Sequence, residues 1–468
     1  MRRLFFLTLS VVSFSVTILA TTIHVPDDLP TIQAGLNIAT EGDTVLVASG
    51  TYYENIIWPA VNGIKLIGSG EEVCTIDGDQ QGSVIRFEAY LNGIVDTTTL
   101  IQDFTIQNGY AQGFGGYGTG GGIFCQSASP RLEHMTLAGN LSRFMGGGTH
   151  LENSNPRLEN VTIRDNSADI GGGISCSDSN PDLAQVMING NSAEFGGGIF
   201  CWNSGPTFMD AEVTENSADY RGGGIYCENA RPCFLNVTIT GNSADSGGGI
   251  SCWYSGPTLM NVTITGNSAE VGGGISCTDY SDPTLINCIL WNDSPQEIDL
   301  SSSIILVSCS DIEGGWTGEH NIDADPLFCD SENDDYRLQI DSPCRTDVCG
   351  FMGYTGETCE GEGVDDTIAE SAGLSLSRNY PNPFNPTTTI EFTLPYPEQI
   401  DLSLYNIMGQ RVAVLAEGTY TAGIHRVIFD AQSSSPGAGS SRPLASSVYL
   451  YRLTTDEEVI SRKMILIR

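Results

Sequence analysis

Short runs of alternating apolar and polar residues occur throughout the middle of the chain, and glycine, proline or asparagine bounds each run. In the stretch from Gly247 to Val271, one run covers Ile250 to Cys252 after three glycines, and another covers Asn261 to Thr265 after a Gly-Pro turn. Period-two alternation is typical of half-buried β-strands, and the residues between the runs are typical of turns. The pattern therefore predicts short strands and turns, with no room for a helix in the unit.

The same unit recurs at an almost constant interval. The triplet Gly-Gly-Gly begins at residues 120, 146, 171, 196, 222, 247 and 272, so successive steps are 25 or 26 residues. A unit of this size cannot bury an apolar face alone, but it can when successive units stack. We therefore predict an all-β fold, a parallel β-helix with coils of about 25 residues, in which the glycines turn the same tight corner in every coil.

Stacking in this register predicts columns of identical side chains. Two inward apolar columns are expected, Val161, Val186, Val237 and Val262 in one and Ile163, Ile188, Ile239 and Ile264 in the other. A third column holds Cys125, Cys176, Cys201, Cys227, Cys252 and Cys277, with Leu151 in the remaining place. Leucine replaces a buried thiol but not a metal ligand, so we interpret these cysteines as small core residues.

Asparagines recur in step with the glycines. They are Asn140, Asn166, Asn191, Asn216, Asn242, Asn267 and Asn292. Because a stacked amide can donate to one neighbour and accept from the other, the pattern predicts a ladder of hydrogen-bonded side chains.

Charge and the ends of the chain limit the classes of function. The formal net charge is −37, from 57 acidic and 20 basic residues, which argues against nucleic acid as a partner. Two arginines followed by an apolar run predict a cleaved signal peptide over residues 1–20, and no other stretch is long and apolar enough to span a bilayer. We expect a mature chain without a transmembrane segment, whose cysteines meet an oxidising compartment.

Four cysteines lie in the irregular region after the coils and are the best disulfide candidates. They are Cys329, Cys344, Cys349 and Cys359. Three pairings are possible, and the spacing alone does not choose among them.

The GGGIxC and GNSA units resemble the right-handed parallel β-helix repeats of the pectin-lyase-like superfamily. The segment from His24 to Gly78 resembles the first coils of pectinesterase-like β-helices, which implies that Thr31 to Ala39 form a short helix that plugs the open end of the core. Asp311 to Phe328, with Tyr336 to Cys344, resembles the closing coils of secreted bacterial β-helix proteins. The resemblance implies one β-helix domain over residues 21–359.

The C-terminal segments Asn379 to Pro395 and Ser446 to Arg468 closely resemble the C-terminal sorting domain of type IX secretion cargo. That resemblance implies a Gram-negative host, the type IX secretion machinery as a partner, and a secreted or outer-surface location. The same region has about seven alternating runs, which predict a small β-sandwich over residues 374–468. The acidic stretch of residues 360–373 is interpreted as a linker.

One outward feature is a column of carboxylates just before five of the glycine corners: Asp169, Glu194, Asp219, Asp245 and Glu270. Like charges at this spacing repel each other. One hypothesis is that calcium bridges them, and the alternative is that they are solvated and screened by salt.

A second outward feature is a row of aromatic residues: Phe124, Phe200, Trp202, Tyr226, Trp253 and Tyr254. Exposed aromatic rings in a row suit stacking on sugar rings or docking of a protein partner. The alternative is that they shield the sheet beneath or lie under the glycine-rich insertion Ala111 to Gly118.

Catalytic chemistry has little support in the sequence. Pectinesterase-like enzymes need paired aspartates with arginine and glutamine on one face, and the motifs that carry these residues are absent from the chain. Neither His134 nor His150 has a nucleophile beside it in the predicted register. We therefore predict no catalytic residues, and a secreted or surface β-helix that binds polysaccharide, a cell-surface glycan or a surface partner. The alternative is a polysaccharide lyase or hydrolase with an unfamiliar site.

Overall fold

The computed structural model describes most of the chain in two compact units, Met1–Glu362 and Gly363–Arg468. The residues described are 20–88, 94–113, 118–346, 348–354, 359, 375–376, 379, 386–394, 398–406, 411–421, 423–431, 444, 447–455 and 459–466. The predicted signal peptide, apart from Ala20, and the predicted linker of residues 360–373 lie outside them. Of the helices in these residues, none has the length and apolar content needed to cross a membrane.

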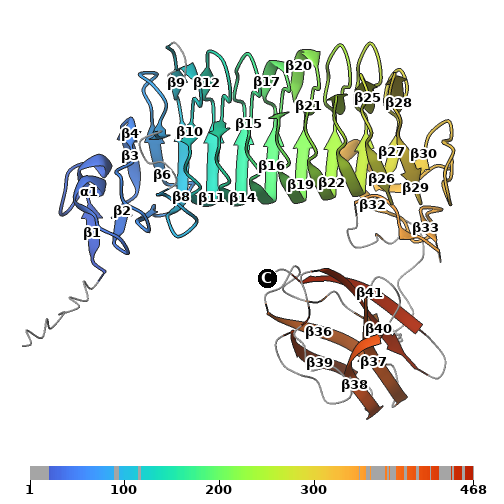
Figure 1. The fold of residues 1–468 in the computed structure, drawn as a ribbon. Helices are drawn as coiled ribbons and strands as arrows, with labels where there is room; N and C mark the ends of the chain where they lie inside the picture. Colours follow the sequence, from blue (N-terminus) through green and yellow to red (C-terminus); the bar gives the residue numbers. More distant parts are fainter. Residues whose placement is uncertain are drawn as a thin grey trace, which may run out of the picture. The chain divides into compact units, whose positions relative to one another are not determined.

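The first unit is a parallel β-solenoid, which confirms the predicted fold class (Figure 1). Its coils stack in chain order and form two long parallel sheets. The 16-stranded sheet contains β1 Thr22–Val25, β2 Thr44–Val47, β3 Gly50–Tyr53, β5 Lys65–Ile67, β6 Cys74–Asp77, β8 Leu100–Gln107, β11 Arg131–Ala138, β14 Arg157–Arg164, β16 Asp182–Asn189, β19 Thr207–Thr214, β22 Cys233–Thr240, β24 Thr258–Thr265, β26 Thr284–Ile286, β27 Ile289–Trp291, β29 Leu306–Ser308 and β30 Asp311–Ile312.

The second long sheet is built from shorter strands that follow the glycine corners. It contains β4 Ile56–Ile57, β7 Ile85–Phe87, β10 Ile123–Gln126, β13 Thr149–Glu152, β15 Ile174–Ser177, β18 Ile199–Trp202, β21 Ile225–Glu228, β23 Ile250–Trp253, β25 Ile275–Thr278 and β28 Ile298–Ser301. Two small parallel pairs lie on the turns between the long sheets, β9 Tyr110–Ala111 with β12 Leu141–Ser142, and β17 Ser192–Phe195 with β20 Ser217–Arg221.

The core forms as the alternation predicts. Val161 pairs with Val186 and Ile163 with Ile188, and all four side chains are buried. The six repeated cysteines are buried free thiols, and Leu151 lies in register between Cys125 and Cys176. Burial of these columns is the main stabilising contribution.

The glycine corners satisfy two separate requirements of the backbone. The first glycine of the triplet has a left-handed conformation, as at Gly171, where φ is +66°. The third needs the absence of a side chain, because a Cβ on Gly173 would lie 2.6 Å from the carbonyl oxygen of Gly198 in the next coil. Together these requirements explain the glycine triplet at each corner.

The predicted asparagine ladder is present and buried. Asn166 donates from its backbone nitrogen and from Nδ2 to Oδ1 of Asn191, both at 3.0 Å. Nδ2 of Asn191 donates in turn to Oδ1 of Asn216 and to the carbonyl oxygen of Ile163, both at 2.9 Å. Each amide therefore joins three successive coils.

The ladder ends at Asp293, so the prediction that Asn292 belongs to it is wrong. The last step of the ladder is 26 residues rather than 25, and Asn292 is exposed. Asn267 donates to Oδ1 of Asp293 from its backbone nitrogen at 2.7 Å and from Nδ2 at 2.9 Å. Oε1 of Glu297 accepts from the backbone nitrogen of Asp293 at 3.0 Å, and so takes the place of a further ladder residue.

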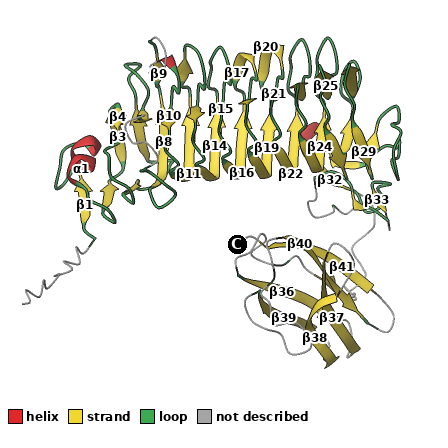
Figure 2. Ribbon diagram, viewed as in Figure 1, coloured by secondary structure: helices red, strands yellow, loops and turns green. Residues whose placement is uncertain are grey.

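The N-terminal end of the solenoid is closed by the predicted helix, α1 Ile32–Ile38 (Figure 2). Oγ1 of Thr31 caps it by accepting from the backbone nitrogen of Ala34 at 3.1 Å. Ile32 and Leu36 are completely buried in the core cluster, which confirms that this helix plugs the end.

Small antiparallel elements form the other end: β31 Phe328–Asp330, the 3₁₀ helix η3 Ser331–Asn333, β32 Asp335–Leu338, β33 Arg345–Thr346 and β34 Gly350–Phe351. Two disulfides join this region, Cys309 to Cys349 and Cys329 to Cys359. Cys344 instead stays a buried thiol whose Sγ donates to Oδ2 of Asp311 at 2.9 Å. The inclusion of Cys344 among the bonded cysteines was therefore wrong, because the last coil brings Cys309 to Cys349.

The second unit has seven strands in its described residues and confirms the predicted number of alternating runs. One antiparallel sheet contains β35 Ser375–Leu376, β36 Thr387–Leu394 and β39 Gly423–Asp430. The other contains β37 Glu398–Asn406, β38 Arg411–Tyr420, β40 Ser447–Thr454 and β41 Val459–Leu466. Apolar side chains from both sheets form one core, as in a β-sandwich.

Candidate functional site

The 10-stranded sheet sets the direction of the predicted aromatic side chains. In β18, Ile199 and Cys201 belong to the core cluster, whereas Phe200 and Trp202 lie outside it on the other face. The same alternation places Tyr226 and Trp253 on this outer face. The predicted aromatic positions are therefore outward with respect to the core.

Three of the six aromatic residues are nevertheless covered, so the expectation that they are exposed is wrong for them. Phe124, Phe200 and Tyr226 are only 1%, 4% and 5% exposed. Phe195, from the preceding turn, lies 6.0 Å from Tyr226 between ring centroids, and Phe200 lies 5.5 Å from the same ring. The turn before a glycine corner, which carries Phe195, thus covers part of this face of the sheet.

The other three aromatic residues remain accessible, and a further exposed aromatic residue, Tyr280, lies beside them. Trp202 and Tyr254 are 40% and 49% exposed, Trp253 is half-buried, and Tyr280 is 78% exposed. Tyr254 lies 5.3 Å from Trp253 and stacks on Tyr280 at 6.2 Å between ring centroids. Tyr280 follows Tyr254 by one repeat, a spacing that could have revealed it. We call Trp202, Trp253, Tyr254 and Tyr280 the aromatic ridge.

Polar groups are interleaved with the aromatic ridge. Glu228 pairs in register with Trp202 on one side and with Trp253 on the other, so the two indoles are two coils, or about 10 Å, apart. Nε1 of Trp253 donates to Oδ2 of Asp279 at 2.8 Å, which fixes the orientation of that ring. Partial burial raises the pKa of Glu228, and a hydrogen bond from Tyr226 opposes that effect. The ridge thus offers ring faces with hydrogen-bonding groups between them.

The five predicted calcium ligands are all exposed and lie along the edge of the turns. The backbone nitrogen of Glu194 donates to the carbonyl oxygen of Asp169 at 2.9 Å, and that of Glu270 to Asp245 at 3.0 Å, so each pair occupies adjacent coils. A β-bulge between β17 and β20 interrupts the column near Asp219. In the residues that the structure describes, no three histidine, cysteine or acidic side chains are grouped to hold a metal ion. Calcium at this column remains a hypothesis.

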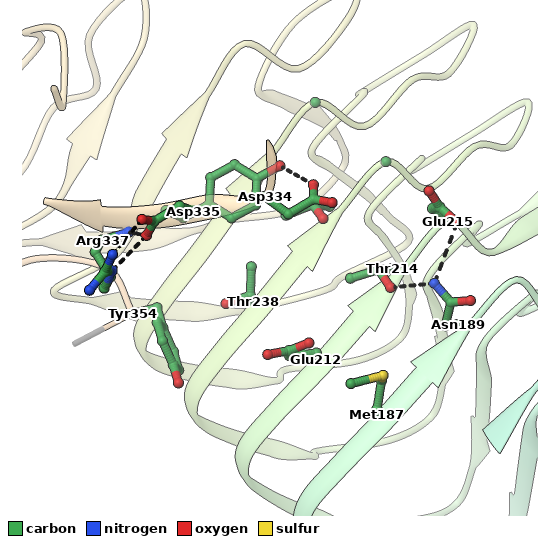
Figure 3. A pocket seen from close by; sticks show the side chains of 14 residues that line it. Met187, Asn189, Glu212, Thr214, Glu215, Thr238, Asp334, Asp335, Arg337 and Tyr354 are labelled. Atoms are coloured by element: carbon green, nitrogen blue, oxygen red, sulfur yellow. Dashed lines mark hydrogen bonds and ion pairs between the residues drawn. The ribbon is translucent and has the colours of Figure 1, made fainter. Parts of the chain in front are cut away.

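A separate pocket of about 400 Å³ lies on the outer face of the 16-stranded sheet, and the sequence analysis did not predict it (Figure 3). Its floor is formed by side chains from β16, β19 and β22, among them Met187, Glu212 and Thr238. The closing region lies over this floor and contributes residues around β32, together with Tyr354. Nothing in the repeat pattern shows where the closing region folds, which is why the pocket was missed.

Four carboxylates, those of Glu212, Glu215, Asp334 and Asp335, are among the polar groups that line this pocket. Nδ2 of Asn189 donates to Oγ1 of Thr214 at 2.9 Å and to Oε2 of Glu215 at 3.4 Å. Arg337 donates through Nε and a terminal nitrogen to the two oxygens of Asp335, at 2.8 and 2.6 Å, and this hydrogen bonding lowers the pKa of Asp335. The arginine is therefore held by a neighbouring charge in its own strand.

The two histidines considered in the sequence lie in different surroundings. His134 is largely exposed, with Nδ1 3.9 Å from Oδ1 of Asp103. His150 is only 3% exposed and stacks on Phe124, with 5.8 Å between ring centroids. Burial lowers the pKa of His150 to about 4, and an interaction with the Ser175 backbone opposes part of this effect.

Comparison with known families agrees with both units of the chain. Residues 197–318 match the right-handed β-helix region, and residues 378–467 match the secretion system C-terminal sorting domain. The chain therefore contains a right-handed parallel β-helix and a type IX sorting domain, and the sorting domain indicates export to the cell surface or secretion. No curated protein matches the chain.

Solved structures give distant matches. Pectate lyase Pel9A is 12% identical, with a TM-score of 0.41, over 70% of this chain and 88% of that chain. The catalytic unit of a thermostable GH87 α-1,3-glucanase from Streptomyces thermodiastaticus strain HF3-3 is 13% identical, with a TM-score of 0.30, over 65% and 69%. Pectin methylesterase PemA from Erwinia chrysanthemi is 11% identical, with a TM-score of 0.29, over 65% and 92%.

Proposed function

We propose that this exported β-helix binds glycan outside the cell through the aromatic ridge and has no catalytic role of its own. The observation that supports the proposal is the set of exposed rings at regular coil spacing on the outer face of the 10-stranded sheet. Sugar rings present apolar C–H faces that pack against indole and phenol rings, while their hydroxyls need hydrogen-bonding partners at the sides.

The ridge supplies both kinds of contact. Trp202 and Trp253 are separated by two coils, about 10 Å, which is close to the length of a disaccharide. Glu228 lies between them, and the amides of Asn203 and Asn229 lie on the adjoining turn, where both residues are exposed. A linear glycan laid along the solenoid axis would place alternate rings on the two indoles, with carboxylate and amide groups beside its hydroxyls.

A glycan array with the mature protein, followed by titration calorimetry with the best ligand, tests the proposal. The double variant Trp202→Ala and Trp253→Ala should weaken binding at least about 30-fold, because stacking of one ring contributes roughly 1–2 kcal/mol. Tyr53→Ala is the matched control, since Tyr53 is 70% exposed on β3 and lies outside the ridge. Unchanged affinity in the double variant would exclude the ridge as the binding surface.

The second candidate is a polysaccharide lyase or hydrolase, and the pocket of Figure 3 is the observation that favours it. Glu212, Glu215 and Asp334 line this pocket together, and glycan-cleaving enzymes use carboxyl groups as acid and base. Assays for reducing ends and for unsaturated products on pectin and alginate should be blank under the first proposal. Activity that is lost in Glu212→Gln would establish the second.

A further inference from the structure

A second pocket, of about 540 Å³, opens on the outer side of the 10-stranded sheet and shares Trp202 with the aromatic ridge. Phe144 and Met145 from one turn and Ile170 from the next contribute apolar surface to its wall. His150 of β13 also lines it. The pocket therefore combines an aromatic wall with a buried polar group.

His150 is the unusual component of this pocket. His150 is only 3% exposed, its ring interacts with the Ser175 backbone, and its Nδ1 is buried without a hydrogen-bond partner of its own among the described residues. The imidazole is neutral at pH 7, because burial lowers its pKa to about 4. Buried polar atoms in folded proteins nearly always have a partner, so a ligand or solvent atom is expected beside this nitrogen.

The remaining polar side chains of the pocket are dominated by carboxylates. Glu152, Asp169 and Asp178 line it, and no lysine or arginine does. The hydrogen bonds given to Glu152 and Asp178 come from neutral amides, Gln126 at 2.9 Å and Asn203 at 3.4 Å. Neither of these contacts brings a positive charge to the carboxylates.

Two arginines lie near the pocket without lining it. Arg86 pairs with Glu88 at 2.7 Å and lies over the ring of Phe124, and Arg143 lies 5.5 Å from the ring centroid of Phe144. The positive charge of Arg86 also acts on His150 and helps to lower its pKa, whereas the charged side chains that line the pocket itself are all acidic.

The pocket suits an organic cation better than a metal ion. The described residues include no group of three ligands placed to hold a metal, and the acidic side chains here are spread over two adjacent coils and the turn between them. The indole of Trp202 attracts ammonium groups through its ring face, and carboxylates nearby strengthen that attraction. A ligand that carries an ammonium group on a rigid, partly apolar ring can contact both the indole of Trp202 and the carboxylates.

We infer that this pocket makes the protein selective for glycans that carry free amino groups over neutral and acidic ones. The inference rests on the proposed function, because Trp202 belongs to both the pocket and the aromatic ridge. The sugar stacks on Trp202, its ammonium lies among Asp169, Asp178 and Glu152, and a hydroxyl or amine approaches Nδ1 of His150.

The test compares three ligands of equal length with the full mature chain at about pH 6: a glucosamine oligomer, its N-acetylated form and an oligogalacturonate. At low salt the glucosamine oligomer should bind roughly tenfold more tightly than the acetylated one, and the difference should shrink severalfold at about 0.5 M salt. The oligogalacturonate should bind most weakly, because its charge has the same sign as the pocket.

Variants distinguish the effect of the pocket's carboxylates on ligand preference from the effect of the protein's net negative charge. Asp169→Asn with Asp178→Asn should remove most of the preference, whereas Asp27→Asn, an exposed carboxylate near the N-terminus, should not change it. His150→Phe keeps the stacking on Phe124 and removes Nδ1, so it should reduce affinity severalfold with an unchanged melting temperature.

Each contrary result has a distinct meaning. Equal affinity for the acetylated and free-amine oligomers would overturn the inference and leave glycan binding intact. Absence of binding to every glycan would overturn the proposed function as well. Tighter binding of a lysine-rich peptide than of the glucosamine oligomer, abolished by the same aspartate variants, would overturn the inference by assigning the pocket to a protein partner.

Discussion

Replacing Asp293 by asparagine should stabilise the β-helix at neutral and alkaline pH. Asp293 occupies the ladder position that holds an asparagine in the preceding coils. Its Oδ1 accepts hydrogen bonds from the backbone nitrogen and Nδ2 of Asn267, as Oδ1 of a ladder asparagine does from the residue one coil before it. The second oxygen of Asp293, Oδ2, is buried beside the carboxyl group of Glu297, which can donate to it only while that pair of groups holds a proton. In the other coils the equivalent atom is an amide nitrogen that donates to a backbone carbonyl, as Asn267 does to Ile239 at 2.9 Å.

The sign of the pH effect follows from the carboxyl pair at the end of the ladder. Burial raises the pKa of both Asp293 and Glu297, because the two groups face each other away from solvent. A carboxyl group whose pKa is raised by folding contributes its full stability at low pH and loses it as the pH rises through the raised value. The wild-type protein should therefore lose stability as the pH rises from about 5 to 8.

The magnitude combines two terms. Leaving one buried acceptor without a partner costs about 1–3 kcal/mol, and a new amide hydrogen bond contributes about 1 kcal/mol. Asp293→Asn removes the first term and adds the second, so the variant should be more stable than wild type by about 2–4 kcal/mol at pH 8. At about pH 5, where the protonated carboxyl already acts as a donor, the difference should fall below about 1 kcal/mol.

Urea denaturation of wild type and variant at both pH values measures these differences. Asp182→Asn is the matched control, because Asp182 is exposed at the start of β16 and its replacement should change stability by less than about 0.5 kcal/mol. Destabilisation by Asp293→Asn at pH 8 would refute the reasoning, and so would an equal stabilisation at both pH values.

Four further predictions address other parts of the chain. Asn191→Ala should destabilise the β-helix by about 3 kcal/mol in urea denaturation, because it leaves buried groups on both neighbouring coils without partners, whereas Asn37→Ala, at an exposed position of α1, should be nearly neutral. Cys329→Ser should lower the stability of the closing region by about 2–4 kcal/mol, and peptide mapping without reductant should recover its link to Cys359 in wild type. If calcium bridges the acidic column, a chelator should lower the melting midpoint, and an unchanged midpoint would exclude that site. Deletion of residues 374–468 should leave the β-helix inside the cell envelope on fractionation, because the matched sorting domain would be lost.

The repeat pattern was sufficient to predict the interior of the solenoid. Period-two alternation decides which side chains face the core, and the constant interval decides which of them stack, so Val161 and Val186 could be paired without a structure. The strands of the second unit followed from local alternation in the same way, whereas the helix that Thr31 caps was implied only by the resemblance to pectinesterase-like β-helices.

Features that depend on coil length or on covering loops could not be predicted in this way. One added residue moved the ladder position from Asn292 to Asp293, a difference that the average interval conceals. Phe200 and Tyr226 were expected on the surface because alternation gives the face of a sheet but not what lies over that face. The pocket of Figure 3 depends on where the closing region folds back, and no periodic signal specifies that position.

The hydrogen bonds between coils recur with nearly the same partners from one glycine corner to the next, so neighbouring coils meet through almost interchangeable contact surfaces. Duplication or loss of one whole unit would rejoin surfaces of the same kind, and the length of the rod can change without redesign of its core. The surface groups would shift by the same increment, about 4.8 Å for each unit. Loss of the unit that carries Glu228 would bring Trp202 and Trp253 onto adjacent coils. Recombination within the repeats would therefore change the distance between the two indoles on which the proposed glycan site depends.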